Sequence, residues 1–104
     1  DDICDTAGSL VAGCEILKRY GAKDIYTGIT HGVFSRDAIA KIENSPITKM
    51  VITDTIPLRE DQKTCTTKIQ VLSIAEMLAN TIESIENHTP VSKVYEEYSF
   101  DSFK

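Results

Sequence analysis

The amino-terminal stretch Asp1-Asp2-Ile3-Cys4-Asp5-Thr6-Ala7-Gly8-Ser9-Leu10 joins three carboxylates to a Thr-Ala-Gly-Ser segment and leads into an apolar pattern of helical period. Backbone N–H groups are free in the first turn of a helix, and the helix dipole favours an anion there. Gly8 has no Cβ and allows a close approach of the backbone, while Thr6 and Ser9 add hydroxyl donors. The carboxylates suit sugar hydroxyls or a cation. The stretch therefore predicts a loop with acceptors for a ribose and donors for its phosphate.

Residues 7–20 after this loop have apolar side chains at helical spacing, and Leu10, Val11, Cys14 and Leu17 are expected to form the inner face. Gly21 is the expected residue just past the helix end. Residues 24–30 read as a parallel strand that is buried on both faces. A short helix from an N-cap at Ser35 to Glu43 follows, with the inner face Ala38, Ile39 and Ile42 and an end at Asn44-Ser45-Pro46.

The second half of the chain continues the alternation. Residues 49–53 and 69–72 are predicted strands, and Ser73 begins a predicted capping box that opens a helix to about Glu86. Residues 54–68 contain the charged run 59–63 and are expected to be a solvated loop. The alternation is typical of an α/β fold with a parallel sheet and flanking helices. The tail, residues 91–104, carries aromatic side chains that need a covering surface, namely Tyr95, Tyr98, Phe100 and Phe103.

Several segments resemble the ribose-phosphate diphosphokinase family, the phosphoribosyl pyrophosphate synthetases, in the family's order. The first is the loop of residues 1–9, which is similar to a phosphoribosyl-pyrophosphate loop. The others are Thr30-His31-Gly32-Val33-Phe34-Ser35, Val51-Ile52-Thr53-Asp54-Thr55-Ile56-Pro57, Ile69-Gln70-Val71-Leu72-Ser73-Ile74-Ala75 and Val91-Ser92. The resemblance covers residues 1 to about 95 and implies a phosphoribosyltransferase type I-like fold.

The resemblance also implies a reaction and a site. The family transfers diphosphate from ATP to O1 of ribose 5-phosphate and forms 5-phosphoribosyl 1-diphosphate (PRPP) and AMP. It implies that Asp1 and Asp2 contact the ribose hydroxyls and that Asp5, Thr6, Ala7, Gly8 and Ser9 wrap the 5-phosphate. Because a carboxylate repels a phosphate, the side chain of Asp5 is expected either to cap the helix or to face the sugar. It implies Mg²⁺ on the nucleotide phosphates, with protein ligands mostly outside this chain, and symmetric homo-oligomers, commonly hexamers. No catalytic residue is predicted among these 104 residues.

The start without Met, and the greater length of the family's chains, lead to the expectation of a carboxyl-terminal part, truncated on its amino-terminal side and inactive alone. Residues 1–104 would be one domain fragment with the loop 1–10 and the tail 91–104. Pro90, just before the tail, and Tyr95, within it, depart from the family's Ser and Phe and weaken the case for its usual allosteric control. His31 is expected to hydrogen-bond backbone, and His88 to lie at a helix carboxyl end.

Composition excludes some classes of protein. The net charge of −5 and the pI of about 4.9 argue against nucleic acid and anionic membranes as partners. No apolar run approaches the ~20 residues of a membrane span, and a cytoplasmic location is expected. The odd cysteine count, with Cys4, Cys14 and Cys65 far apart, predicts free thiols. Two alternatives stay open: a non-catalytic synthetase-associated regulatory subunit and a phosphoribosyltransferase.

Overall fold

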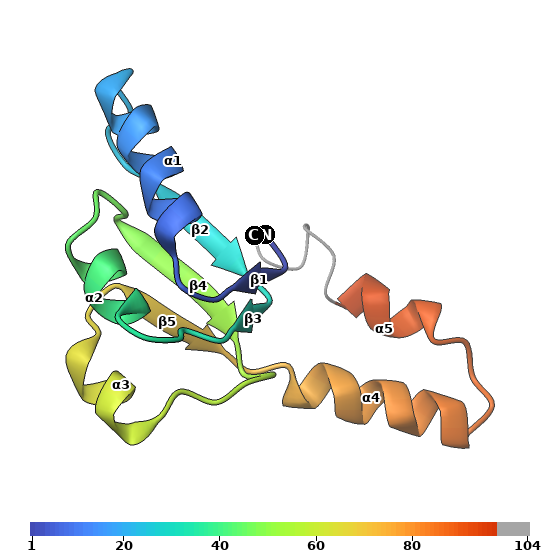
Figure 1. Cartoon of the computed structure of the whole chain (residues 1–104). Coiled ribbons are helices and arrows are strands. Elements are labelled where there is room, and N and C mark those ends of the chain that lie inside the picture. The colour runs from blue at the N-terminus through green and yellow to red at the C-terminus, as the bar shows by residue number, and fades with distance from the viewer. Residues whose placement is uncertain (98–104) are drawn as a thin grey trace. The chain divides into compact units, whose positions relative to one another are not determined.

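The computed structural model describes residues 1–97, and the chain divides into two compact units, Asp1–Leu72 and Ser73–Lys104. The first unit alternates strands and helices (Figure 1). Its elements are β1 (Ile3–Cys4), α1 (Gly8–Arg19), β2 (Tyr26–Ile29), β3 (His31–Gly32), α2 (Ala38–Glu43), β4 (Lys49–Thr53), α3 (Glu60–Cys65) and β5 (Ile69–Leu72). The second unit contains α4 (Ala75–Glu86) and α5 (Ser92–Glu97).

All strand pairs of the first unit are parallel. β2, β4 and β5 form a three-stranded sheet in that order, with Thr27 opposite Met50 and Val51 opposite Gln70. β1 and β3 form a separate two-stranded sheet, in which Ile3 lies opposite His31. The prediction of an α/β fold with parallel strands and flanking helices is confirmed, although the strands form two sheets.

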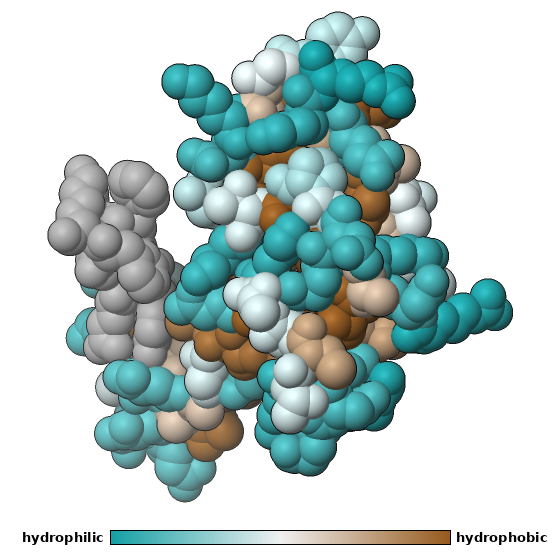
Figure 2. Space-filling model, turned by 90° about the vertical axis from the view of Figure 1, so that its left-hand side faces the viewer, coloured by the Kyte–Doolittle hydropathy of each residue, from teal (hydrophilic) through white to brown (hydrophobic). Residues whose placement is uncertain are grey.

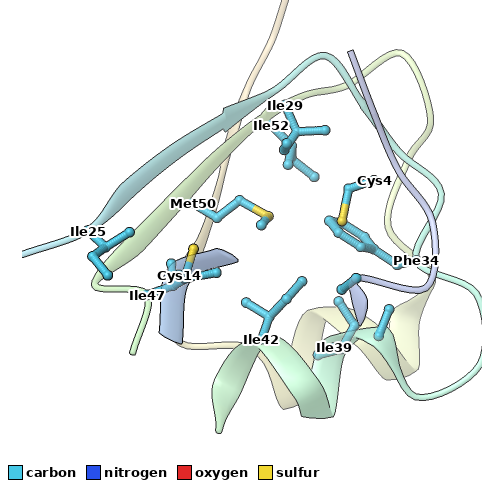
Figure 3. Close-up of a cluster of buried hydrophobic side chains, with 12 residues drawn as sticks. Cys4, Cys14, Ile25, Ile29, Phe34, Ile39, Ile42, Ile47, Met50 and Ile52 are labelled. Atoms are coloured by element: carbon cyan, nitrogen blue, oxygen red, sulfur yellow. The ribbon is translucent and has the colours of Figure 1, made fainter. Parts of the chain in front are cut away.

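The core lies on one face of the three-stranded sheet (Figure 3). Because strand side chains alternate, Met50 and Ile52 of β4 are both buried, whereas Val51 between them is 37% exposed. α1 contributes Cys14 to this core, and the predicted inner face of α2 (Ala38, Ile39 and Ile42) is buried in it. Helices α1 and α2 therefore cover this face of the sheet.

Helix α1 ends as its sequence predicts. Gly21 has a φ of 99°, its N–H donates to the carbonyl of Lys18, and the N–H of Ala22 donates to the carbonyl of Leu17. These two bonds make a Schellman motif. Leu17 itself is 53% exposed, so its predicted place on the inner face was wrong. The second half of α1 projects beyond the sheet (Figure 1). On the face drawn in Figure 2, patches of hydrophobic surface lie between hydrophilic side chains.

Two predictions for strands and loops were also wrong. β2 was predicted to be buried on both faces, but Tyr26 is 69% exposed because β2 is an edge strand with one uncovered face. Residues 54–68 were predicted to be a solvated loop, but they contain α3. Within α3 the charged side chains are exposed, while Gln62 is 6% exposed.

The helix start points differ slightly from prediction. α2 starts two residues later than an N-cap at Ser35 would place it, with Asp37 at the N-cap. Ser73 makes no capping box; its Oγ accepts from the N–H of Ala75, and Ile74 is the N-cap of α4. His88 follows α4 with a φ of 56°, in the left-handed conformation that ends the helix.

The second unit is described to Glu97 and exposes much of its apolar side. Leu78, Ile82 and Ile85 of α4 lie on one helical face and are at least half exposed, at 50%, 66% and 62%. Tyr95 is exposed on α5, whereas Tyr98, Phe100 and Phe103 lie outside the described residues. No helix within residues 1–97 is long and apolar enough to cross a membrane. The three cysteines are free, as predicted.

Candidate functional site

A cavity of about 200 Å³ opens at the amino-terminal end of α1. Six of the seven predicted site residues line it, and the apolar side chains of neighbouring positions complete the wall. The lining residues are Asp1, Ile3, Cys4, Asp5, Thr6, Ala7, Gly8, Ser9, Leu10 and Ile29. The sequence loop therefore folds around a concave surface.

The start of α1 is left open towards this cavity. Ala7 is the N-cap, in the left-handed conformation with a φ of 68°, and its carbonyl accepts from the N–H of Val11 at 3.0 Å. Among the described residues no side chain caps the helix, and its first turn carries no acidic residue. The N–H groups of Gly8, Ser9 and Leu10 have no intrahelical partner by geometry. An uncapped, acid-free helix start of this kind is suited to an anion.

Gly8 stands where a side chain would enter open space. A Cβ built at this residue has no neighbouring atom within 4 Å. The packing of the chain therefore gives no steric reason for glycine here, and glycine in a helix is less stable than alanine. Close approach of a ligand to the backbone is a reason that remains.

The polar side chains of the loop are exposed. Within residues 1–97, no hydrogen-bond partner is found for the hydroxyls of Thr6 and Ser9, which are free to donate to a ligand. Asp5 was predicted either to cap the helix or to face the sugar. It does not cap α1; its carbonyl accepts from the N–H of Ser35 at 3.0 Å, and its side chain lines the cavity.

The two leading carboxylates are placed differently. Asp1 lines the cavity, and its Oδ1 accepts from the N–H of Asp2 at 2.8 Å. Asp2 is exposed and does not line the cavity; its carbonyl accepts from the N–H of His31 at 2.7 Å. Of the predicted site residues, Asp2 is thus the one that the structure does not bring into the cavity.

Sequence reasoning missed the apolar part of the wall, formed by Ile3, Cys4, Leu10 and Ile29. Burial, and secondarily the negative charge of Asp5, raise the pKa of the Cys4 thiol above its ordinary value. Cys4 therefore stays protonated at neutral pH and acts as a small apolar residue. The sequence could have indicated Cys4 as part of the wall, because Cys4 lies inside the loop of residues 1–10. It could not have indicated Ile29, which lies at the end of another strand.

His31 lies beside the site rather than in it. Its Nδ1 is hydrogen-bonded to Thr55 Oγ1 at 2.7 Å, so the expected bond from the ring to backbone was wrong. Thr55 and Thr53 also donate to the carbonyl of Thr30, at 3.2 and 2.5 Å. These residues form a polar cluster where β2 and β4 end.

The described residues do not form a metal centre on their own. Within residues 1–97, no group of three or more His, Cys, Asp or Glu side chains converges so that it could hold a metal ion.

Parallel strands and the helices that cover them define the chain as an α/β protein. A family model described as "Phosphoribosyl synthetase-associated domain" matches residues 1–96, and the chain belongs to this family.

Named relatives and a solved structure agree with this assignment. The chain is 45% identical over 97 residues to a ribose-phosphate pyrophosphokinase of Clostridium acetobutylicum, covering 93% of this chain and 30% of that protein. It is 40% identical over 97 residues to ribose-phosphate pyrophosphokinase A of Dictyostelium discoideum, again with 93% and 30% coverage. The crystal structure of phosphoribosylpyrophosphate synthetase from Mycobacterium smegmatis matches with a TM-score of 0.79 and 35% identity, over 85% of this chain and 29% of that one. The chain thus spans about a third of the length of these relatives.

Proposed function

We propose that the chain is the ribose 5-phosphate-binding part of a cytoplasmic ribose-phosphate diphosphokinase. The observation that carries this proposal is the cavity at the uncapped start of α1, with Gly8 open to it and carboxylates at its edge. An anionic group suits the helix start, and a polyol suits the carboxylates, so one sugar phosphate can satisfy both. The names of the relatives point to the same class of enzyme.

In the proposed reaction, O1 of ribose 5-phosphate attacks the β-phosphorus of ATP. The bond from that phosphorus to the α–β bridging oxygen breaks, and AMP leaves. Such chemistry depends mainly on positioning and on charge stabilisation. The N–H groups at Gly8 and Ser9 and the hydroxyls of Thr6 and Ser9 would hold the 5-phosphate. Asp1 and Asp2 would accept from the ribose hydroxyls, with the stronger geometric support for Asp1, and Asp5 would face the sugar.

The remaining parts of the proposal concern the larger protein. The chain would be the carboxyl-terminal part of a phosphoribosyltransferase type I-like arrangement, would work with ATP bound elsewhere, and would release PRPP. Mg²⁺ would be held by groups other than the described residues of this chain. The complete enzyme would be a homo-oligomer, with a hexamer as the expected form.

A binding experiment and an activity assay test the proposal separately. Titration of the isotopically labelled chain with ribose 5-phosphate should move the amide resonances of residues 5–9, because their N–H groups face the phosphate. Inorganic phosphate should move the same resonances less, and ribose should move them least. The isolated chain should form no AMP from ATP and ribose 5-phosphate. Absence of any ligand-dependent shift in residues 1–9 would show that the site is wrongly assigned.

A non-catalytic synthetase-associated subunit is the second candidate, because the matching family is described as synthetase-associated. It predicts that the complete protein forms no AMP from ATP and ribose 5-phosphate, even where the loop binds the sugar phosphate. AMP formation by the complete protein would exclude it.

A further inference from the structure

The segment from Thr53 to Gln62 contacts the supports of the amino-terminal loop at two separate points. One contact supports Asp1 and Asp2, at the carboxylate end of the loop. The other contact supports Cys4 and Asp5, where the chain turns towards the start of α1. Neither contact is made by a residue that lines the cavity.

The first point is the polar cluster at Thr55. Its hydroxyl is hydrogen-bonded to His31 Nδ1 at 2.7 Å and donates to the carbonyl of Thr30 at 3.2 Å. The N–H groups of Thr30 and His31 in turn donate to the carbonyls of Asp1 and Asp2, at 3.3 and 2.7 Å. Thr55 therefore fixes the positions of Thr30 and His31. These two residues in turn hold the acidic end of the loop through their backbone hydrogen bonds.

The second point is Gln62 of α3. Its Oε1 accepts from the N–H of Arg59 at 3.0 Å, and its Nε2 donates to the carbonyl of Phe34 at 3.2 Å. The N–H of Phe34 donates to the carbonyl of Cys4 at 3.2 Å, and that of Ser35 donates to the carbonyl of Asp5 at 3.0 Å. Gln62 therefore supports the phosphate end of the loop through residues 34–35.

The burial of the two side chains bears on their role. Gln62 is 6% exposed in a run of otherwise exposed charged residues, and a buried amide is tolerated only when both of its ends are paired. Thr55 is exposed, so an apolar residue of the same shape would leave no buried polar atom unpaired. The packing of the core therefore does not require the Thr55 hydroxyl, whereas the position of His31 depends on it.

We propose that Thr55 and Gln62 are positioning residues, which hold the carboxylate end and the phosphate end of the loop at the separation that the sugar phosphate requires. The inference rests on the proposed function for the identity of the ligand. Residues 53–62 act as one brace because both contacts come from one continuous segment that runs from the end of β4 into the first turn of α3. Small misplacements of binding groups lower binding and turnover strongly, which is the reason to brace both ends.

Amide hydrogen exchange of the full 104-residue chain tests the positioning without a ligand. Gln62→Met should speed exchange at Phe34 and Ser35, whereas Thr55→Val should speed it at Thr30 and His31. Thr64→Val, which removes an exposed hydroxyl bonded within α3, and Gln70→Met, on the uncovered sheet face, should change neither pair. If exchange were accelerated equally throughout the first unit, or not accelerated at these four amides, the proposed positioning role would be wrong.

A titration with ribose 5-phosphate then tests the link to binding. Each of Thr55→Val and Gln62→Met should weaken affinity about three- to tenfold, the usual consequence of losing one net hydrogen bond. Thr55→Ser should restore binding, because it keeps the hydroxyl. Affinities equal to that of the unaltered chain would overturn the positioning role and leave the proposed function intact. If the unaltered chain does not bind, the proposed function fails, and the exchange pattern alone decides whether residues 53–62 position the loop.

Discussion

At the scale of single residues, Gly8 is a position at which helix stability favours alanine and ligand binding favours glycine. A Cβ at Gly8 would touch no atom of residues 1–97, and the same is true of Gly13 one turn and a half later in α1. Gly8→Ala and Gly13→Ala should each raise the free energy of unfolding, by up to about 1 kcal/mol for the interior position. Only Gly8→Ala should weaken ribose 5-phosphate binding. Urea unfolding and the titration described above measure the two effects, and equal binding by both variants would contradict the role of Gly8.

Glu43 is the residue on which the start of β5 depends. Its Oε1 accepts from Thr66 Oγ1 and from the N–H groups of Thr67 and Lys68, and its Oε2 accepts from Thr67 Oγ1, at distances from 2.7 to 3.0 Å. Partial burial would raise the pKa of this carboxyl, but the hydrogen bonds outweigh it and lower the pKa from 4.5 to about 2. The ionised carboxylate therefore fastens α2 to the turn before β5.

This shift makes a prediction about stability and pH. The folded pKa lies below the unfolded value, so the contribution of Glu43 is complete above about pH 4.5 and is lost as the pH falls towards about 2. Glu43→Gln should lower the free energy of unfolding by about 1–3 kcal/mol at pH 7 and should reduce its pH dependence in this window. Glu15→Gln, at an exposed site on α1, is the matched control. A pH profile for Glu43→Gln parallel to that of the unaltered chain would contradict the assignment.

At the scale of elements, the connection from β3 to α2 is tightly constrained. Phe34 is fully buried with a φ of 50°, and Arg36 has a φ of 57°. A Cβ on Gly32 would lie 2.5 Å from Cε2 and 2.9 Å from Cζ of Phe34. Because Phe34 fills the core, it cannot move aside without disturbing its neighbours.

Gly32→Ala should therefore lower the free energy of unfolding by about 1–3 kcal/mol, as overpacking does in other cores. Gly28→Ala in β2 is the matched control, since a Cβ there meets no atom within 4 Å. Thermal or urea unfolding measures both. If Gly32→Ala were as stable as Gly28→Ala, the close packing of Phe34 on β3 would be wrong.

At the scale of the whole molecule, the part of each unit that lies within residues 1–97 has an exposed apolar surface. In the first unit this surface is the outer face of the three-stranded sheet, with Tyr26, Val51 and Leu72. In the second it is the face of α4 that carries Leu78, Ile82 and Ile85. Apolar surface in such amounts usually marks a contact site.

We therefore expect the chain to associate with itself. Sedimentation across a concentration series should give a mean mass that rises above 11.5 kDa. Ile82→Lys should reduce this association, because it places a charge on the apolar face. Glu83→Gln changes the net charge by the same amount on another face of α4 and should have little effect. A mass that stays at 11.5 kDa at high concentration would contradict the expectation.

Local patterns were enough for much of the fold. The periods of the apolar residues located α1, α2 and α4, the strand Lys49–Thr53 was predicted with its observed bounds, and Gly21 marked the end of α1 because few other residues adopt its φ. Most of the predicted residues around the cavity could also be named, because residues 5–9 form a continuous run at the start of a helix. These features depend on residues that are near one another in the sequence.

Other features depended on which segments meet in three dimensions. Gln62 looked like one member of a solvated run, and only packing against the Phe34 loop made it buried and paired. Asp2 looked equivalent to Asp1, yet only Asp1 lines the cavity, while the carbonyl of Asp2 accepts from the N–H of His31. A sequence pattern gives the period and the end of an element, because these arise from local backbone geometry. It does not give the partner of a long-range contact, so only the tertiary structure decided how the loop is held.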